Sequence, residues 1–139
     1  MKLLTRDKFR EGTLSRHGGS CCVPECVSPA VDAHHILNRN LFTEPHEEGG
    51  YFLENGAGLC SDHHWDAERT LISVASLRDF CGIGSPAVPA KLDSEVDYDC
   101  WGNTIVDEYT RTPGAMFDNE GCRKALKAGN VLWQFGYNV

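Results

Sequence analysis

Long apolar segments are missing from this 139-residue sequence. No run of about 18 apolar residues occurs, so no segment is predicted to span a membrane and no membrane partner is expected. The start of the chain, MKLLTRDKFREG, carries charges where a secretory signal needs its apolar region, so a cytoplasmic protein is expected. The length predicts one domain, or a compact module with an appendage, around a modest core.

Positive charge is also scarce. The sequence has 13 Lys and Arg against 20 Asp and Glu, and its net charge is −7. An acidic total argues against strong nonspecific binding to nucleic acid, because the neutralisation of phosphates supplies that affinity. The balance is uneven, since residues 1–39 carry a net +2 and the remainder therefore −9. A local basic face is compatible with these numbers.

Cysteine and histidine, by contrast, are abundant in one region. Between residues 21 and 64 the sequence contains four of its seven cysteines and two histidine doublets. A disulfide framework is disfavoured because no secretory signal is visible, and the shared location of Cys and His favours metal ligation. Cys81, Cys100 and Cys122 lack close Cys or His neighbours in the sequence and are predicted to be buried thiols.

Two short motifs predict one zinc site. In CCVPEC, a proline-containing turn separates Cys26 from either Cys21 or Cys22, and Cys21 is slightly favoured because a four-residue turn then lies between the ligands. Cys60 and His63, with two residues between them, supply the other half of the tetrahedron that Zn²⁺ prefers. A structural zinc contributes folding free energy of order 10 kcal/mol in small zinc peptides, so its removal should unfold this region.

Three histidines of the two doublets are left over once the zinc ligands are assigned: His34, His35 and His64. Neighbours along a strand point to opposite sides, so His34 and His35 cannot both face one ion inside a strand. We therefore expect one of them to bind a catalytic metal and the other to face a substrate.

Residues 61–71 (SDHHWDAERTL) predict a helix, with Ser61 or Asp62 as its cap. His64 and Glu68 are four residues apart and share one face of that helix. A histidine and a carboxylate at this spacing form a plausible half-site for a divalent cation. Glu68 could equally be a solvent-facing helix residue.

The flanking segments predict short helices and an irregular arm. One amphipathic helix is expected after Thr5, a second over 73–80, and a last one from a cap at Asp118 to Lys127. Residues 85–116 combine prolines, glycines and acids with little helical period, which indicates an extended arm with one hairpin at WGN.

Aromatic residues are frequent in the C-terminal half. Trp101, Trp133, Phe135 and Tyr137 are predicted to be core or contact residues rather than platforms for base stacking, because aromatic side chains mostly contribute burial. An exposed aromatic end would favour self-association or a protein partner.

The order of the motifs, a Cys pair, His-His-Ile and then Asn-x-x-x-Leu-Cys-x-x-His-His, resembles the HNH endonuclease family of the zinc-stapled, phage type. The resemblance covers residues 5–70 and implies a ββα-metal fold, in which two short strands and a helix surround one ion. We therefore predict an α+β protein with a ββα-metal core and zinc knuckle at 1–72, flanking helices, and an irregular C-terminal arm at 73–139. The arm more loosely resembles the segment that follows HNH modules in certain phage proteins. Some of those proteins carry an RNA ligase domain, but no ligase lysine motif is present here.

The resemblance implies roles for individual residues. His35 matches the general base that activates water, and Asn55 matches the residue that braces the loop, although NGAG is also a strong turn sequence. His34 and His64 match metal ligands, and Glu68 lies where many relatives have a His or Lys. The implied function is hydrolysis of DNA phosphodiesters with one divalent cation, Mg²⁺, Mn²⁺ or another transition metal, beside the structural zinc.

A function from another class stays open: a catalytically silent, zinc-stapled module that binds nucleic acid or protein as an adaptor or subunit. The intact histidine motifs favour the enzyme, whereas the acidic total favours the binding module. Expected partners are DNA and, through the C-terminal arm, a second copy or another protein. The expected location is the cytoplasm, that of the host if a phage encodes the protein.

Overall fold

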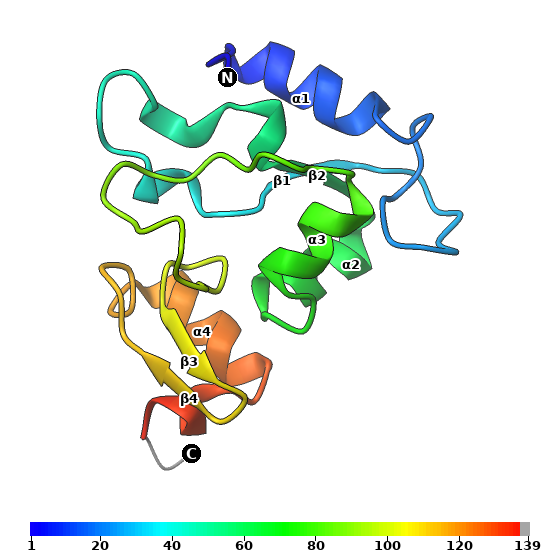
Figure 1. The fold of residues 1–139 in the computed structure, drawn as a ribbon. Coiled ribbons are helices and arrows are strands. Elements are labelled where there is room, and N and C mark those ends of the chain that lie inside the picture. Colours follow the sequence, from blue (N-terminus) through cyan, green and yellow to red (C-terminus); the bar gives the residue numbers. More distant parts are fainter. Residues whose placement is uncertain (137–139) are drawn as a thin grey trace.

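The computed structural model describes residues 1–136 and has an α+β architecture (Figure 1). The described chain contains four α-helices and two antiparallel two-stranded sheets. In chain order these elements are α1 (Arg6–Ser15), β1 (Asp32–His35), β2 (Gly56–Leu59), α2 (Ser61–Glu68), α3 (Val74–Phe80), β3 (Thr104–Asp107), β4 (Thr110–Thr112) and α4 (Glu120–Ala128). None of the helices in this part of the chain has the length and apolar character needed to cross a bilayer.

The first sheet joins the two histidine motifs. β1 pairs with β2 in an antiparallel register that sets Asp32 opposite Leu59 and His35 opposite Gly56. The connection between the strands is longer than a tight hairpin, because residues 36–55 contain three short 3₁₀ turns. α2 begins directly after β2, so two strands and a helix follow in the expected order.

Helix α1 packs on this sheet (Figure 1). Thr5 caps the helix as predicted, since its hydroxyl accepts a hydrogen bond from the Lys8 amide at 3.2 Å. Phe9 and Thr13 are the buried residues of this helix. Gly58 of β2 permits the close approach, because a Cβ there would lie 2.9 Å from the carbonyl oxygen of Thr13.

Two other helix caps differ from the sequence prediction. Cys60 occupies the N-cap position of α2, and its side chain makes no capping hydrogen bond, whereas Ser61 is already helical. Asn119, not Asp118, caps α4 by accepting a hydrogen bond from the Cys122 amide at 3.1 Å. The observed caps, Cys60 and Asn119, each lie one residue away from Ser61 and Asp118, within the usual uncertainty of helix boundaries.

The C-terminal segment is more ordered than the predicted irregular arm. An antiparallel bridge between Tyr98 and Thr104 closes the predicted turn at WGN, and the β3–β4 hairpin, which turns after Asp107, and α4 follow it (Figure 1). Cys81, Cys100 and Cys122 are buried free thiols, as predicted.

The predicted aromatic contacts fall at different depths. Trp101 is buried, and Phe135 packs on Phe117 with ring centroids 4.7 Å apart. Trp133 is 43% exposed, so it contributes less to the core than expected. Tyr137 lies outside the described residues.

One hydrophobic core runs through the described chain. Its buried members extend from Leu59 in β2 through Leu77 in α3 to Leu126 in α4. The buried residues after position 72 therefore belong to the same hydrophobic cluster as those of the first sheet and α2.

Candidate functional site

One cluster has the donors of a metal site. The ligand atoms of Cys21, Cys26, Cys60 and His63 all lie within 4.8 Å of one another. His63 Nδ1 is 3.4 Å from Cys21 Sγ and 3.3 Å from Cys60 Sγ. Three sulfurs and one imidazole nitrogen at these separations could hold a metal such as zinc.

The structure distinguishes between the two candidate cysteines of the knuckle. The Cys21 amide donates to the Ser28 carbonyl at 2.9 Å, which closes the turn and brings Cys21 to the cluster. Cys22 instead contacts Cys81 in the core, and this contact together with burial raises the pKa of Cys22. Cys22 is therefore not part of the cluster.

The other three histidines of the two doublets lie around a separate cleft. A cavity of about 300 Å³ is lined by His34 and His35 of β1, and by His64 and Glu68 of α2. His34 packs edge-on against His64 with ring centroids 5.1 Å apart. His35 points to the other side of the strand and stacks on Phe9, with ring centroids 4.7 Å apart. The two neighbours therefore face different parts of one cleft.

Both β1 histidines have an unpaired ring nitrogen. His34 Nε2 and His35 Nε2 are buried and have no hydrogen-bond partner among the described residues. Burial is the main reason that the pKa of His34 falls to about 3, with additional repulsion from the neighbouring His64 and His35. Both nitrogens are thus free to accept a proton or to bind an ion.

The pKa of His35 falls to about 4, chiefly through burial and secondarily through the positive charge of Arg39. A backbone contact with Gly49 opposes this shift. The sequence alone predicts a value near 6.5, because it cannot show that Phe9 and Tyr51 enclose the ring. His35 is therefore neutral at neutral pH, as a proton acceptor must be.

His64 has the opposite electrostatic environment. Glu68 Oε1 lies 3.0 Å from its Nε2, and Asp32 Oδ2 lies 3.2 Å from its Nδ1. The hydrogen bond to Glu68 is the largest cause of the raised pKa of His64, and Asp32 adds to it against the effect of burial. Both ring nitrogens therefore face carboxylate oxygens, an environment that favours the protonated form of the ring.

Asp32 is the residue that sequence reasoning missed. Alternate residues of a strand share a face, so Asp32 and His34 of β1 are on the same side. That spacing, read together with the helical pair of His64 and Glu68, is the signal that could have found it. The result is a group of two carboxylates and two imidazoles contributed by β1 and α2.

Asn55 is buried, with 1% of its surface exposed. Its Oδ1 accepts a hydrogen bond from the Leu37 amide at 3.0 Å, and its Nδ2 donates to the Leu37 carbonyl at 3.0 Å. The same Nδ2 donates to the Gly50 carbonyl at 3.4 Å. Asn55 does not have a positive φ, so a left-handed turn is not the reason for this residue. Its amide joins the segment after β1 to the loop that contacts His35.

Three arginines bring positive charge to the cleft of this acidic protein. Arg6 and Arg10 of α1 and Arg39 after β1 line the cavity and are exposed. Arg10 also donates a hydrogen bond to the Val31 carbonyl at 3.2 Å, which fixes its direction. An anionic polymer could therefore approach the histidines against the overall net charge.

The two groups of donors differ in compactness. Among the described residues, only the Cys21 cluster brings three or more such ligand atoms within 4.8 Å of one another. Around His64, the two carboxylates bind opposite edges of the ring.

Comparison of the chain with protein-family models, with curated proteins and with solved structures found no match.

Proposed function

We propose that this protein is a metal-dependent endonuclease of the HNH type, which hydrolyses DNA phosphodiester bonds. The observation that carries the proposal is the convergence of His35, His34 and His64 on one cleft that exposed arginines line. The formation of a hydrophobic core alone does not require three histidines from two separate motifs to line the same cleft. The resemblance of the motif order to the HNH family points to the same chemistry.

His35 is the proposed general base. Its Nε2 has no partner among the described residues and is neutral at neutral pH, so it can take a proton from a water molecule that attacks phosphorus. Phe9 and Tyr51 hold the ring in place by stacking and edge contacts. The contact with Gly49 orients the ring from the loop that Asn55 braces.

A divalent cation is the proposed cofactor of the cleft, and the donors fit such an ion. His34 offers a buried, unpaired Nε2, and His64, Asp32 and Glu68 add one imidazole and two carboxylates. This mixed set suits Mn²⁺ and other transition metals, and its carboxylates also suit Mg²⁺. When bound, the cation stabilises negative charge that develops on the phosphate and the leaving oxygen. To bind an ion, one ring nitrogen of His64 would have to lose its proton and its carboxylate contact, whereas the other could keep its hydrogen bond to a carboxylate.

A structural zinc is proposed for the second centre. Cys21, Cys26, Cys60 and His63 form a closed set of four donors, which is typical of structural sites, whereas a catalytic zinc keeps one position open. Because Cys60 and His63 lie at the start of α2, a zinc there ties that helix to the knuckle. It would thereby fix the direction in which α2 presents His64.

The alternative, a silent binding module, is favoured by two observations. The net charge of −7 weakens general affinity for DNA. The donors around His64 are also less compact than those of the Cys21 cluster. A module of this kind would keep the zinc centre and the cleft without turnover.

Plasmid cleavage separates the two functions. With Mn²⁺ or Mg²⁺, wild-type protein should convert supercoiled DNA to nicked or linear forms, and His35→Ala should lower the rate by about 10² to 10⁴-fold. His46→Ala is the matched control, because the side chain of His46 is 74% exposed and is not among the residues that line the cleft. If wild-type protein cuts nothing with any divalent ion, the binding module is the better account. Equal cutting by His35→Ala would refute the assignment of the base.

A further inference from the structure

We infer that a turn in the C-terminal segment, residues 99–103, positions the catalytic cleft, with Trp101 as its main positioning residue. The inference rests on the proposed function, since it concerns the same cleft. This turn is closed by a bridge between Tyr98 and Thr104 and by a hydrogen bond from the Asp99 amide to the Asn103 carbonyl at 2.9 Å. It lies far in sequence from the histidine motifs and contacts both walls of the cleft.

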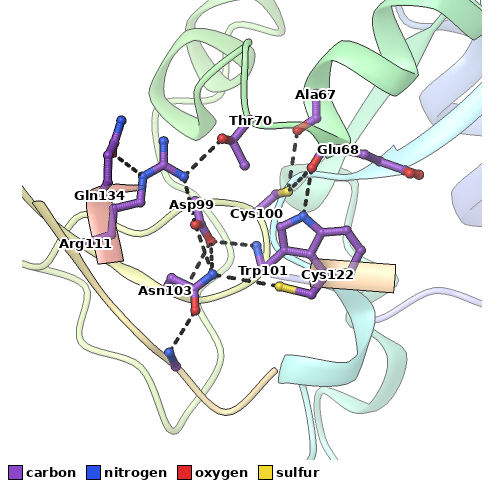
Figure 2. Close-up of polar contacts among 11 residues, drawn as sticks. Ala67, Glu68, Thr70, Asp99, Cys100, Trp101, Asn103, Arg111, Cys122 and Gln134 are labelled. Carbon is purple, nitrogen blue, oxygen red and sulfur yellow. Dashed lines mark hydrogen bonds and ion pairs between the residues drawn. The ribbon is translucent and has the colours of Figure 1, made fainter. Parts of the chain in front are cut away.

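The first wall is the C-terminal end of α2. The last carbonyls of a helix have no partner inside the helix and need one elsewhere. The indole Nε1 of Trp101 donates to the Glu68 carbonyl at 2.8 Å, and Cys100 Sγ donates to the Ala67 carbonyl at 3.5 Å (Figure 2). The turn therefore holds the backbone of the residue whose carboxylate bonds to His64.

The second wall is the segment that follows β1. The Asn38 amide donates to the Cys100 carbonyl at 2.8 Å, and Asn38 comes three residues after His35. Cys100 and Trp101 also line the cavity together with these residues. One short turn thus joins the element that carries His35 to the element that carries His64.

The turn itself is held rigid by a buried carboxylate. Asp99 is 2% exposed, and its Oδ1 accepts hydrogen bonds from the Trp101 and Asn103 amides, both at 3.0 Å (Figure 2). Arg111 of β4 donates through Nη1 to Asp99 Oδ2 at 3.0 Å and to Thr70 Oγ1 at 3.0 Å. Since Thr70 follows α2, this arginine forms a second link between the turn and the end of that helix.

Loss of a hydrogen bond between the 99–103 turn and α2 should therefore alter the positions of the cleft residues without unfolding the protein. Without the indole donor, the Glu68 carbonyl keeps only the long contact from Cys100 Sγ at 3.9 Å, and the last turn of α2 is held less firmly relative to β1. The spacing between the β1 and α2 donors then varies, which weakens binding of an ion that needs both elements. The segment after residue 72 is on this account part of the catalytic unit.

Trp101→Phe tests the inference, because it keeps an aromatic side chain at this buried position and removes the N–H donor together with part of the indole ring. Trp133→Phe is the matched control, since Trp133 Nε1 donates to a backbone carbonyl of Asn130 at 2.9 Å but is not among the residues that line the cleft. Three experiments are made on the full chain: amide hydrogen exchange at residues 69–71, titration with Mn²⁺ for the dissociation constant, and plasmid nicking for kcat and KM. Melting temperatures show whether each variant is folded.

For Trp101→Phe we expect exchange at residues 69–71 to be about tenfold faster and the Mn²⁺ dissociation constant to be about tenfold higher. We also expect kcat to fall while KM changes little, and Trp133→Phe to match wild type in all three experiments. Unchanged exchange in Trp101→Phe would overturn the inference. Faster exchange with unchanged Mn²⁺ affinity and unchanged kcat would reduce the turn to a structural element and also overturn it.

The outcome is separable from that of the proposed function. If wild-type protein neither binds Mn²⁺ in the cleft nor cuts DNA, the nuclease proposal fails, and hydrogen exchange alone then decides whether the turn holds α2. Should Trp101→Phe not fold, Arg111→Lys serves as the second variant. It removes the Arg111 link to Thr70 while it keeps a positive charge near Asp99.

Discussion

Asn55→Ala should destabilise the protein strongly, although it removes only a small polar group. Asn55 satisfies both backbone polar groups of Leu37, which is itself buried, and also bonds to the Gly50 carbonyl. Truncation leaves the amide and the carbonyl of Leu37 without partners. Each unpaired buried group costs about 1 to 3 kcal/mol, so the loss should be about 2 to 6 kcal/mol. That is a large share of the stability of an ordinary domain.

Urea unfolding of the zinc-loaded protein measures this loss. Asn119→Ala is the matched control, because it is the same substitution at an exposed helix cap where one hydrogen bond is lost. The control should cost about 1 kcal/mol. An Asn55→Ala variant that loses no more stability than the control would refute the reasoning that the buried amide braces the loop.

The remaining predictions concern the two centres and the arginines. Cys21→Ser should lose the bound zinc and melt at a lower temperature, whereas Cys22→Ser should keep one zinc per chain, as measured by elemental analysis. The affinity for Mn²⁺ should rise as the pH rises through the raised pKa of His64, because a ring nitrogen of His64 must lose its proton before it can bind an ion. Calorimetry at several pH values measures this affinity, and an affinity that does not change with pH would contradict the prediction. Arg39→Gln should weaken binding to a short DNA duplex and reduce the slope of log affinity against log salt by about 1, whereas an unchanged slope would remove Arg39 from the DNA contact.

The local parts of the site could be predicted from the sequence because short spacings determine them. A turn between Cys21 and Cys26 and a two-residue spacer between Cys60 and His63 bring the donors together with little help from the rest of the chain. Strand alternation likewise predicted that His34 and His35 face different sides. The helix that carries His64 and Glu68 followed from its own pattern, apart from its cap.

The long-range parts could not be predicted in the same way. The low pKa of His35 depends on the packing of Phe9 from α1, and the contacts of Trp101 with Glu68 join residues 33 positions apart. No periodicity connects such residues, because the contact arises only when separate elements share one core. Asp32 combines both cases. The strand spacing predicts that it shares a face with His34, but nothing in the sequence predicts its contact with His64 of α2.

Anomalous diffraction from crystals grown with zinc and soaked in Mn²⁺ tests the central claim of two separate centres most directly. We predict a zinc signal among Cys21, Cys26, Cys60 and His63, and a distinct manganese signal in the cleft in contact with His34 and His64. A cleft without manganese, or a single metal centre in the whole chain, would contradict the account.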